Sequence, residues 1–250
     1  MNDSLGDRMK EYEPVTQTHL VRRMPAILRL DGRAFHTFTK KMKKPFDDYM
    51  FALMHFTAYK LVQEIQTSVL AYCQSDEISI LLKDYSKIET QAWFGGNVQK
   101  MVSISAALAT AYFNRTLLPG LPENDTNDDV PPVFDSRIFN VPKEDVVNYF
   151  IWRQKDATRN SINAVGQANF SHSQLQGKSQ NDVLDMLHDK GINWNDTPTK
   201  FKRGFCIVRG PVEVKVAGIT TKAEGVHADT NIPIFTENRE YISRFLEAEV

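Results

Sequence analysis

The stretch that decides the fold is residues 68–82, which read SVLAYCQSDEISILL. Two apolar runs, 68–74 and 78–82, flank the short polar break formed by Ser75, Asp76 and Glu77. Apolar runs rich in strand-forming residues on either side of a short polar break predict an antiparallel hairpin. The carboxylates of Asp76 and Glu77 are therefore expected at the tip of this hairpin.

The elements around the hairpin follow a definite order. An apolar run over 25–30 stops at Asp31 and Gly32, which predicts a buried strand ending in a turn. Apolar residues at helical spacing predict helices over 48–67, capped by Asp47 or Asp48, and over 98–117, and a strand is predicted over 133–141. This is the βαββαβ order of ferredoxin-like domains, an α+β fold that also forms the palm of many polymerases and nucleotide cyclases. The fold alone does not give the function.

The second half of the chain predicts a mostly helical region. Helix is expected from Lys143 to about Phe170 with a break near Gly166, over 179–190, and over 236–249. A second hairpin is expected to pair 204–209 with 212–216 across Gly210 and Pro211, and the proline-rich acidic segment 119–132 is expected to be an exposed loop. The predicted parts are an N-terminal extension (1–25), a palm-like catalytic core (26–141) and a C-terminal helical and hairpin region (142–250).

The composition is that of a globular protein, with 42% hydrophobic and 24% charged residues. The formal net charge is -1, so any attraction for a polyanion must come from local patches. Cys73 and Cys206 each lie in an apolar stretch, which is typical of reduced core cysteines in a cytosolic protein. No signal-peptide core and no membrane-crossing run is evident, so the sequence predicts a cytoplasmic protein.

The positions of the acids suggest a metal site. The first and third strands of a βαββαβ sheet are neighbours, so Asp31 is expected close to Asp76 and Glu77. Carboxylates gathered at strand ends suit Mg²⁺, and two such ions about 3.5–4 Å apart can activate an attacking hydroxyl and stabilise a leaving phosphate. The simpler alternative is that Asp-Gly is an ordinary turn and that the acids at the hairpin tip are only solvated.

Five motifs, in order along the chain, resemble those of the tRNA-His guanylyltransferases and their bacterial, archaeal and phage relatives. Residues 29–36, RLDGRAFH, resemble the family pattern R-L-D-G-R-x-F-H, and residues 44–47, KPFD, resemble K-P-N-D. Residues 71–79, AYCQSDEIS, resemble A-Y-G-Q-S-D-E-[YF]-S, and residues 152–156, WRQKD, resemble W-R-Q-x-D. Residues 192–195, INWN, followed by Lys202, Arg203 and Gly204, are similar to I-N-Y-N and a later basic pair with glycine. The resemblance extends over about residues 26–209.

The resemblance implies a palm fold and a reaction opposite in direction to that of ordinary polymerases. The 3′-hydroxyl of an incoming nucleotide, often GTP, attacks a tRNA 5′ end that ATP has activated. Two Mg²⁺ ions are expected on Asp31, the backbone carbonyl of Gly32, and Asp76, with Glu77 as an auxiliary carboxylate. The nucleotide-binding residues that the resemblance implies are Arg29, Gly32, Arg33, Ala34, Phe35, His36, Lys44, Asp47, Ser75 and Asp76. For Lys40 and Lys41 a solvated loop is the simpler interpretation, and the side chains of Phe35 and Phe38 fit the core better than base stacking.

The resemblance also implies a tRNA partner, a homotetramer, and contacts of the C-terminal region with tRNA. The residues expected to make these contacts are Arg153, Gln154, Arg159, Lys178, Lys202 and Arg203. Where eukaryotic members have H-I-N-N, this chain has Thr158, Arg159, Asn160 and Ser161. That departure suits the "like protein" branch of the family, which resembles a template-dependent repairer of truncated tRNA 5′ ends.

Two other hypotheses share parts of this pattern. A nucleotide cyclase on a palm fold would use the same metal-binding acids and form a cyclic product from GTP alone, without a tRNA surface. A non-catalytic RNA-binding module of ferredoxin-like fold would carry aromatic residues on a strand for base stacking, and no such strand is evident.

Overall fold

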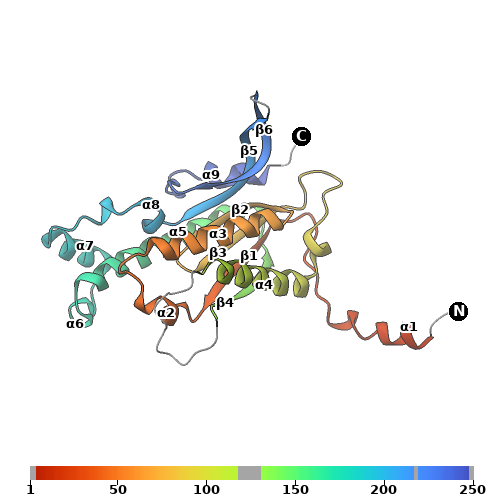
Figure 1. Cartoon of the computed structure of the whole chain (residues 1–250), viewed down its shortest axis with the longest axis horizontal. Coiled ribbons are helices and arrows are strands. Elements are labelled where there is room, and N and C mark those ends of the chain that lie inside the picture. The colour runs from red at the N-terminus through yellow and green to blue at the C-terminus, as the bar shows by residue number, and fades with distance from the viewer. Residues whose placement is uncertain (1–3, 118–130, 217–218, 248–250) are drawn as a thin grey trace.

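A six-stranded antiparallel sheet forms the centre of the computed structural model, which describes residues 4–117, 131–216 and 219–247 (Figure 1). Its strands lie in the order β4-β1-β3-β2-β5-β6. The strands are β1 (Ala26–Arg33), β2 (Ser68–Gln74), β3 (Glu77–Leu82), β4 (Val133–Asn140), β5 (Phe205–Val216) and β6 (Ile219–Asp229). The first four have the ferredoxin-like arrangement, so the predicted α+β palm fold is confirmed.

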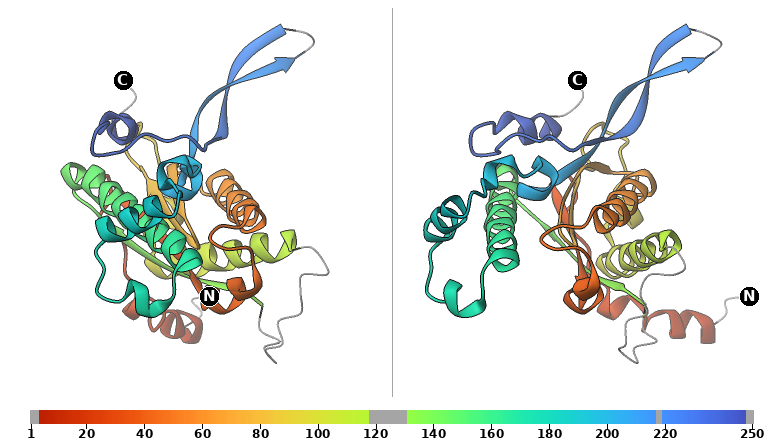
Figure 2. Two further views of the ribbon diagram at one scale, coloured as in Figure 1. Left: turned by 90° about the vertical axis from the view of Figure 1, so that its left-hand side faces the viewer. Right: turned by 60° about the vertical axis from the view of Figure 1, so that its left-hand side comes forward.

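Two long helices cover one face of the sheet, α3 (Asp48–Glu64) and α4 (Val98–Thr116) (Figure 2). Leu53 and Leu61 of α3 and Phe113 of α4 are fully buried against this face. The side chain of Asp47 caps α3 by accepting hydrogen bonds from the amides of Tyr49 and Met50, at 2.8 and 3.2 Å. Both helices therefore begin and end close to where the sequence predicts.

The opposite face is covered by α5 (Lys143–Asn169) and by the chain end that contains α9 (Glu240–Ser243) (Figure 2). Phe150 of α5 and Phe235 pack against Tyr72 of β2, and all three are fully buried. The central strands are thus buried on both faces, which explains why 68–74 and 78–82 are almost continuously apolar.

The remaining helical elements are short. They are α1 (Ser4–Lys10), α2 (Phe35–Phe38), α6 (His172–Leu175), α7 (Gln180–Asp189), α8 (Thr199–Lys202) and the 3₁₀ turns Pro14–Thr16, Thr39–Lys41, Trp93–Gly96, Trp194–Asp196 and Arg244–Leu246. Within the described segments, none of the helices combines the length and the apolar character that crossing a bilayer requires.

Three predictions about the second half are wrong. Helix α5 continues through Gly166 without a break, because the glycine lies where α7 packs: a Cβ there would be 2.8 Å from a methyl carbon of Val183. Gly210 and Pro211 are not a turn; they lie inside β5, opposite Gly225 and Glu224 of β6. The final helix is short, with α9 followed by the 3₁₀ turn Arg244–Leu246.

Two other predictions concern the loop over 119–132 and the division of the chain into three parts. Of the expected loop over 119–132, residues 119–130 lie outside the described residues. The sheet takes β1 to β4 from the predicted core and β5 and β6 from the predicted C-terminal region. The division of the chain into three parts stays a prediction.

Candidate functional site

The register of the sheet places the predicted acids side by side. Asp31 of β1 lies directly opposite Glu77 of β3, and the amide of Gly32 donates a hydrogen bond to the carbonyl oxygen of Asp76 at 3.1 Å. Strand β1 does not end at Asp31 but continues to Arg33, because its other edge pairs with β4. The expected proximity of Asp31, Gly32 and Asp76 is therefore confirmed.

The carboxyl of Asp76 is perturbed by its surroundings. Burial, followed by the negative charges of Asp31 and Glu77, raises the pKa of the Asp76 carboxyl, although a hydrogen bond with the Ser75 side chain acts in the opposite direction. A cation held between Asp31 and Asp76 would relieve this repulsion. Two carboxylates and a backbone carbonyl are hard oxygen ligands of the kind that Mg²⁺ accepts while it keeps several waters or phosphate oxygens. The residues present therefore fit magnesium.

Glu77 is held differently from the other two acids. Arg153 of α5 donates to both of its carboxylate oxygens, at 2.8 and 2.6 Å, and Arg29 of β1 forms an ion pair with it at 2.7 Å. The hydroxyl of Ser79 donates to it at 3.2 Å. With its side chain only 6% exposed and its oxygens occupied, Glu77 supports the hairpin and does not face the cavity described below.

The segment after β1 is shaped by one aromatic ring. Phe35 is 2% exposed and contacts the rings of Phe38, Phe113 and Phe134. Its ring lies so close to Gly32 that a Cβ at that position would be 2.4 Å from it, so only glycine fits. The side chain of Phe35 is thus part of the core. The prediction that this side chain contacts a nucleotide directly is wrong. Arg33, Ala34 and His36 are exposed.

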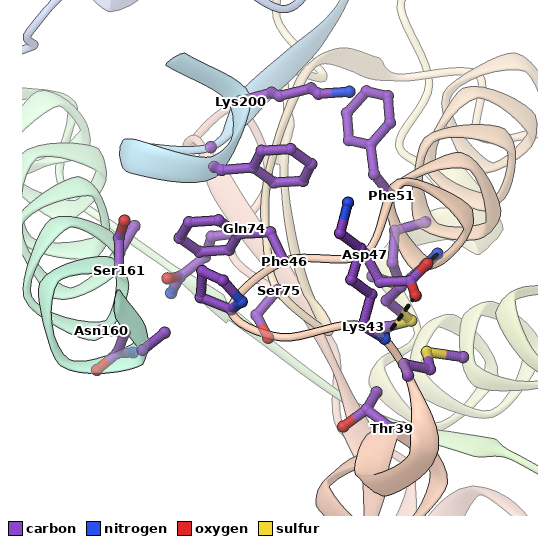
Figure 3. Close-up of a pocket in the computed structure, with 18 of the residues that line it drawn as sticks. Thr39, Lys43, Phe46, Asp47, Phe51, Gln74, Ser75, Asn160, Ser161 and Lys200 are labelled. Atoms are coloured by element: carbon purple, nitrogen blue, oxygen red, sulfur yellow. Dashed lines mark hydrogen bonds between the residues drawn. The ribbon is translucent and has the colours of Figure 1, made fainter. Parts of the chain in front are cut away.

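A cavity of about 220 Å³ opens at Ser75, the residue that precedes Asp76 (Figure 3). Its walls come from the end of β2, from the segment that leads into α3, from α5, and from α8 with the start of β5. Three of the predicted nucleotide-binding residues line it, Lys44, Asp47 and Ser75. Arg29, Gly32, Arg33, Ala34, Phe35 and His36 do not line it. The predicted nucleotide-binding residues therefore form two groups, one along the 32–36 segment and one around the cavity.

Two of the lining residues have local structural partners. The ammonium of Lys44 donates to the carbonyl oxygen of Thr39 at 3.0 Å and remains exposed. Burial acts to raise the pKa of Asp47, but hydrogen bonds from the backbone amides of Lys43, Met50 and Tyr49 outweigh it and lower the pKa. Asp47 thus fixes the start of α3 at the rim of the cavity.

The sequence interpretation assigned no site role to several other lining residues. They are Phe46, Gln74, Asn160, Ser161 and Phe201, and Lys200, one of the basic residues predicted for the tRNA surface, also lines the cavity. The rings of Phe46 and Phe201 are stacked, with centroids 4.9 Å apart and planes 4° apart, and the ammonium of Lys200 lies 4.7 Å from the Phe201 ring centroid. Phe46 and Gln74 lie inside the motifs at 44–47 and 71–79, so the sequence contained a signal that these two residues belong to the site. Phe201 and Asn160 come from distant segments that only the tertiary structure brings together.

The residues expected to bind tRNA divide into two groups. Arg153 and Gln154 are 4% and 5% exposed. Gln154 donates to the carbonyl of Pro233 at 2.9 Å and accepts from the amide of Phe235 at 2.8 Å. For these two residues, the expectation of a surface contact with tRNA is wrong, because both side chains hold α5 to its neighbours. Arg159 and Lys178 are exposed, while Lys202 and Arg203 are half-buried at the start of β5.

The fold and the acidic edge together define a class of protein. A ferredoxin-like sheet with two helices on one face, paired carboxylates at the β1–β3 edge and a cavity beside them is the arrangement of palm-fold enzymes that act on nucleotides. The cavity and the exposed cations around it favour an enzyme over a non-catalytic RNA-binding module.

Comparison with known proteins narrows this class. The family model described as tRNAHis guanylyltransferase matches residues 6–142, more than half of the chain. A solved bacterial tRNA(His) guanylyltransferase-like protein in complex with ATP is 42% identical, with a TM-score of 0.84 over 98% of this chain and 99% of that chain. The bacterial protein in complex with GTP is 40% identical, with a TM-score of 0.82 over the same shares. A probable tRNA(His) guanylyltransferase of Bos taurus is 31% identical over 78% of this chain and 67% of its own length.

This chain belongs to the tRNA-His guanylyltransferase family, in its guanylyltransferase-like branch, and it is a nucleotidyltransferase.

Proposed function

We propose that this protein is a magnesium-dependent 3′-to-5′ nucleotidyltransferase that repairs the 5′ ends of tRNAs, with ATP and GTP among its substrates. The observation that carries the proposal is the position of Asp31 on β1 beside Asp76 in the β2–β3 turn, next to a cavity lined by Lys43, Lys44 and aromatic rings. Solved relatives in complex with ATP and with GTP support nucleoside triphosphates as ligands.

Asp31, the carbonyl of Gly32 and Asp76 would hold two Mg²⁺ ions. When bound, such ions lower the pKa of an attacking hydroxyl and stabilise the charge on the phosphate oxygens. Lys43 and Lys44 lie at the cavity rim as point charges for a triphosphate. Arg33 and His36 are exposed in the segment that follows Asp31, where they can contact phosphate oxygens.

Glu77 has a supporting role in this proposal. Its two arginine partners neutralise it and fix the start of β3, so the neighbouring Asp76 is presented in one position. Arg153 therefore acts as a positioning residue from the opposite face of the sheet, and it is no longer proposed as a tRNA ligand.

The proposed tRNA surface keeps Arg159, Lys178, Lys202 and Arg203. Such contacts to backbone phosphates position the acceptor end without reading its sequence. Of the stretch that replaces the H-I-N-N block, Asn160 and Ser161 line the cavity while Arg159 is exposed. We therefore propose that the enzyme selects a tRNA by its missing 5′ nucleotide and not by a His anticodon. A cytoplasmic homotetramer is part of the proposal, as the family resemblance implies.

The experiment incubates tRNAs with each nucleoside triphosphate in turn, in the presence of Mg²⁺. The tRNAs are labelled at the 3′ end and are either full-length or lack one 5′ nucleotide. The proposal expects the truncated tRNA to gain a nucleotide at its 5′ end, and expects the reaction to stop when the metal is chelated. Growth at the 3′ end, or formation of a cyclic nucleotide from GTP alone, would contradict it.

A further inference from the structure

Gln74 is a buried carboxamide without a hydrogen-bond partner. It is the last residue of β2, it is 7% exposed, and it lines the cavity directly before Ser75. Across the residues that the structure describes, no group donates to its side chain or accepts from it. The carboxamide is still reached from the cavity, so it is free to hydrogen-bond a molecule that binds there.

The surroundings of Gln74 suit a nucleobase. Figure 3 shows Gln74, Ser75 and Phe46 between the helix that carries Asn160 and Ser161 and the helix that carries Phe51. The stacked pair Phe46–Phe201 offers a flat apolar surface, and base–aromatic stacking accepts any base. Lys43 and Lys44 line the same cavity and provide positive charge for phosphates.

Phe46 changes the polar character of the cavity wall. It stands where the family pattern K-P-N-D has asparagine, so one polar side chain that could contact a base is replaced by a ring. The carboxamides that remain on the cavity wall are those of Gln74 and Asn160, and Asn160 is exposed. Of the two carboxamides, Gln74 is the buried one, and the hydroxyl of Ser161, which is also buried at the wall, already accepts a hydrogen bond from the Trp194 indole.

Resting on the proposed function, we infer that Gln74 reads the edge of the nucleotide base and sets the relative affinity of the site for adenine and guanine. A carboxamide carries both a donor and an acceptor, and a half-turn about its last torsion exchanges them. It can match the adenine edge, which presents one donor and one acceptor, and also the guanine edge, which presents a different pattern. A carboxylate can only accept, so it cannot match both bases.

The test is calorimetric titration of the whole protein with ATP, GTP and CTP, in the presence of Mg²⁺. Gln74→Glu is expected to change the ratio of ATP to GTP affinity by about fivefold, in the direction set by which base edge faces residue 74. Gln74→Met keeps the size of the side chain and removes its polar groups, so it is expected to weaken ATP and GTP by about fivefold each and CTP less. The matched control is Gln99→Glu on the exposed side of α4, which should bind all three nucleotides as the natural protein does.

The inference would be overturned if both Gln74 variants bound ATP and GTP as the natural protein does. It would also be overturned if Gln74→Glu left the ratio of ATP to GTP affinity unchanged, or if Gln74→Met weakened CTP binding as much as binding of the purine nucleotides. Thermal unfolding shows whether each variant folds. If Gln74→Glu does not fold, the nucleotide affinities of Gln74→Met decide whether the inference holds. Failure of the proposed function looks different, because the natural protein would then add no nucleotide to tRNA whatever the variants bind.

Discussion

Two neighbouring acids in this site have opposite surroundings. Asp76 lies in a turn beside Asp31 and has no arginine partner in the part of the chain that the structure describes, while Glu77, one residue on, is neutralised by Arg29 and Arg153. The sequence alone presents Asp76 and Glu77 as equivalent. The structure assigns the exposed negative potential to Asp31 and Asp76, and these are the residues on which the proposed chemistry depends.

The first prediction concerns these two carboxylates. Asp31→Ala and Asp76→Ala should each lower the rate of nucleotide addition by at least about a hundredfold, or about 2.7 kcal/mol in the activation free energy. Losing a metal ligand removes activation of the hydroxyl and stabilisation of the phosphate together. Single-turnover rates measure the loss, and Asp185→Ala on the exposed side of α7 is the control. Near-natural rates in a folded variant would refute the assignment.

The second prediction concerns pH. Because the pKa of Asp76 is raised above 3.8 in the folded protein, its ionisation destabilises the fold, and this cost develops as pH rises from 3.8 through the folded pKa. Without divalent cations, Asp76→Asn should therefore raise the Tm at pH 7, and the difference from the natural protein should vanish below pH 3.8. Mg²⁺ should raise the Tm of the natural protein more than that of the variant. A variant less stable than the natural protein at pH 7 would contradict this account.

At the scale of elements, an ion pair between Arg153 and Glu77 joins α5 to the β2–β3 hairpin. Arg153 and Glu77 have side chains that are 5% and 6% exposed, whereas that of Arg159, nearly two turns further along the helix, is 57% exposed. Both arginines come from a stretch that sequence reasoning assigned to tRNA contact. Arg153 is therefore a buried structural cation, whereas Arg159, although paired with Asp156, lies at the surface where it can reach a phosphate.

The third prediction compares these two arginines. Arg153→Ala should lower the free energy of unfolding by about 3–5 kcal/mol, because it leaves the Glu77 carboxylate buried without its main partner. Arg159→Ala should change stability by less than about 1 kcal/mol and weaken tRNA binding. Denaturant unfolding and tRNA titration measure the two effects. If Arg153→Ala left the free energy of unfolding unchanged and weakened only tRNA binding, the prediction that Arg153 contacts tRNA would be correct.

The fourth prediction concerns the contact between α5 and α7. Gly166→Ala should destabilise the protein by about 1–3 kcal/mol, although alanine favours a helix, because its methyl would lie 2.8 Å from Val183. The loss should be smaller when Val183→Ala is present as well, since the shortened side chain leaves room. Equal losses in both backgrounds would mean that glycine is needed there for another reason.

The elements that the sequence predicted well are those in which a repeating apolar pattern reports burial. The hairpin of β2 and β3, helices α3 and α4, and the proximity of Asp31 to Asp76 all follow from such patterns. The failures come from glycine and proline, which were interpreted as breaks. Gly166 is required by packing, and Pro211 is tolerated because β5 pairs with β2 only as far as Val208 and then has one open edge. The cavity was missed because its walls come from four separate segments.

At the scale of the whole molecule, helices α5 to α8 lie together on one side and the β5–β6 hairpin extends away from the sheet (Figure 2), and the cavity lies between α5, α8 and the segment before α3. The chain is nearly neutral, so tRNA must be held by local cations on this side. The central claim is that the nucleotide is added at the 5′ end and is chosen by the base opposite the gap.

The measurement that tests this claim most directly is extension of truncated tRNA-His and a truncated non-His tRNA, each prepared with all four bases opposite the missing 5′ nucleotide. The account predicts that both tRNAs are extended at the 5′ end in the presence of Mg²⁺, and that the added nucleotide is the complement of the opposing base in every case. Extension of tRNA-His alone, by G whatever the opposing base, would contradict the repair function and leave a guanylyltransferase specific for that tRNA.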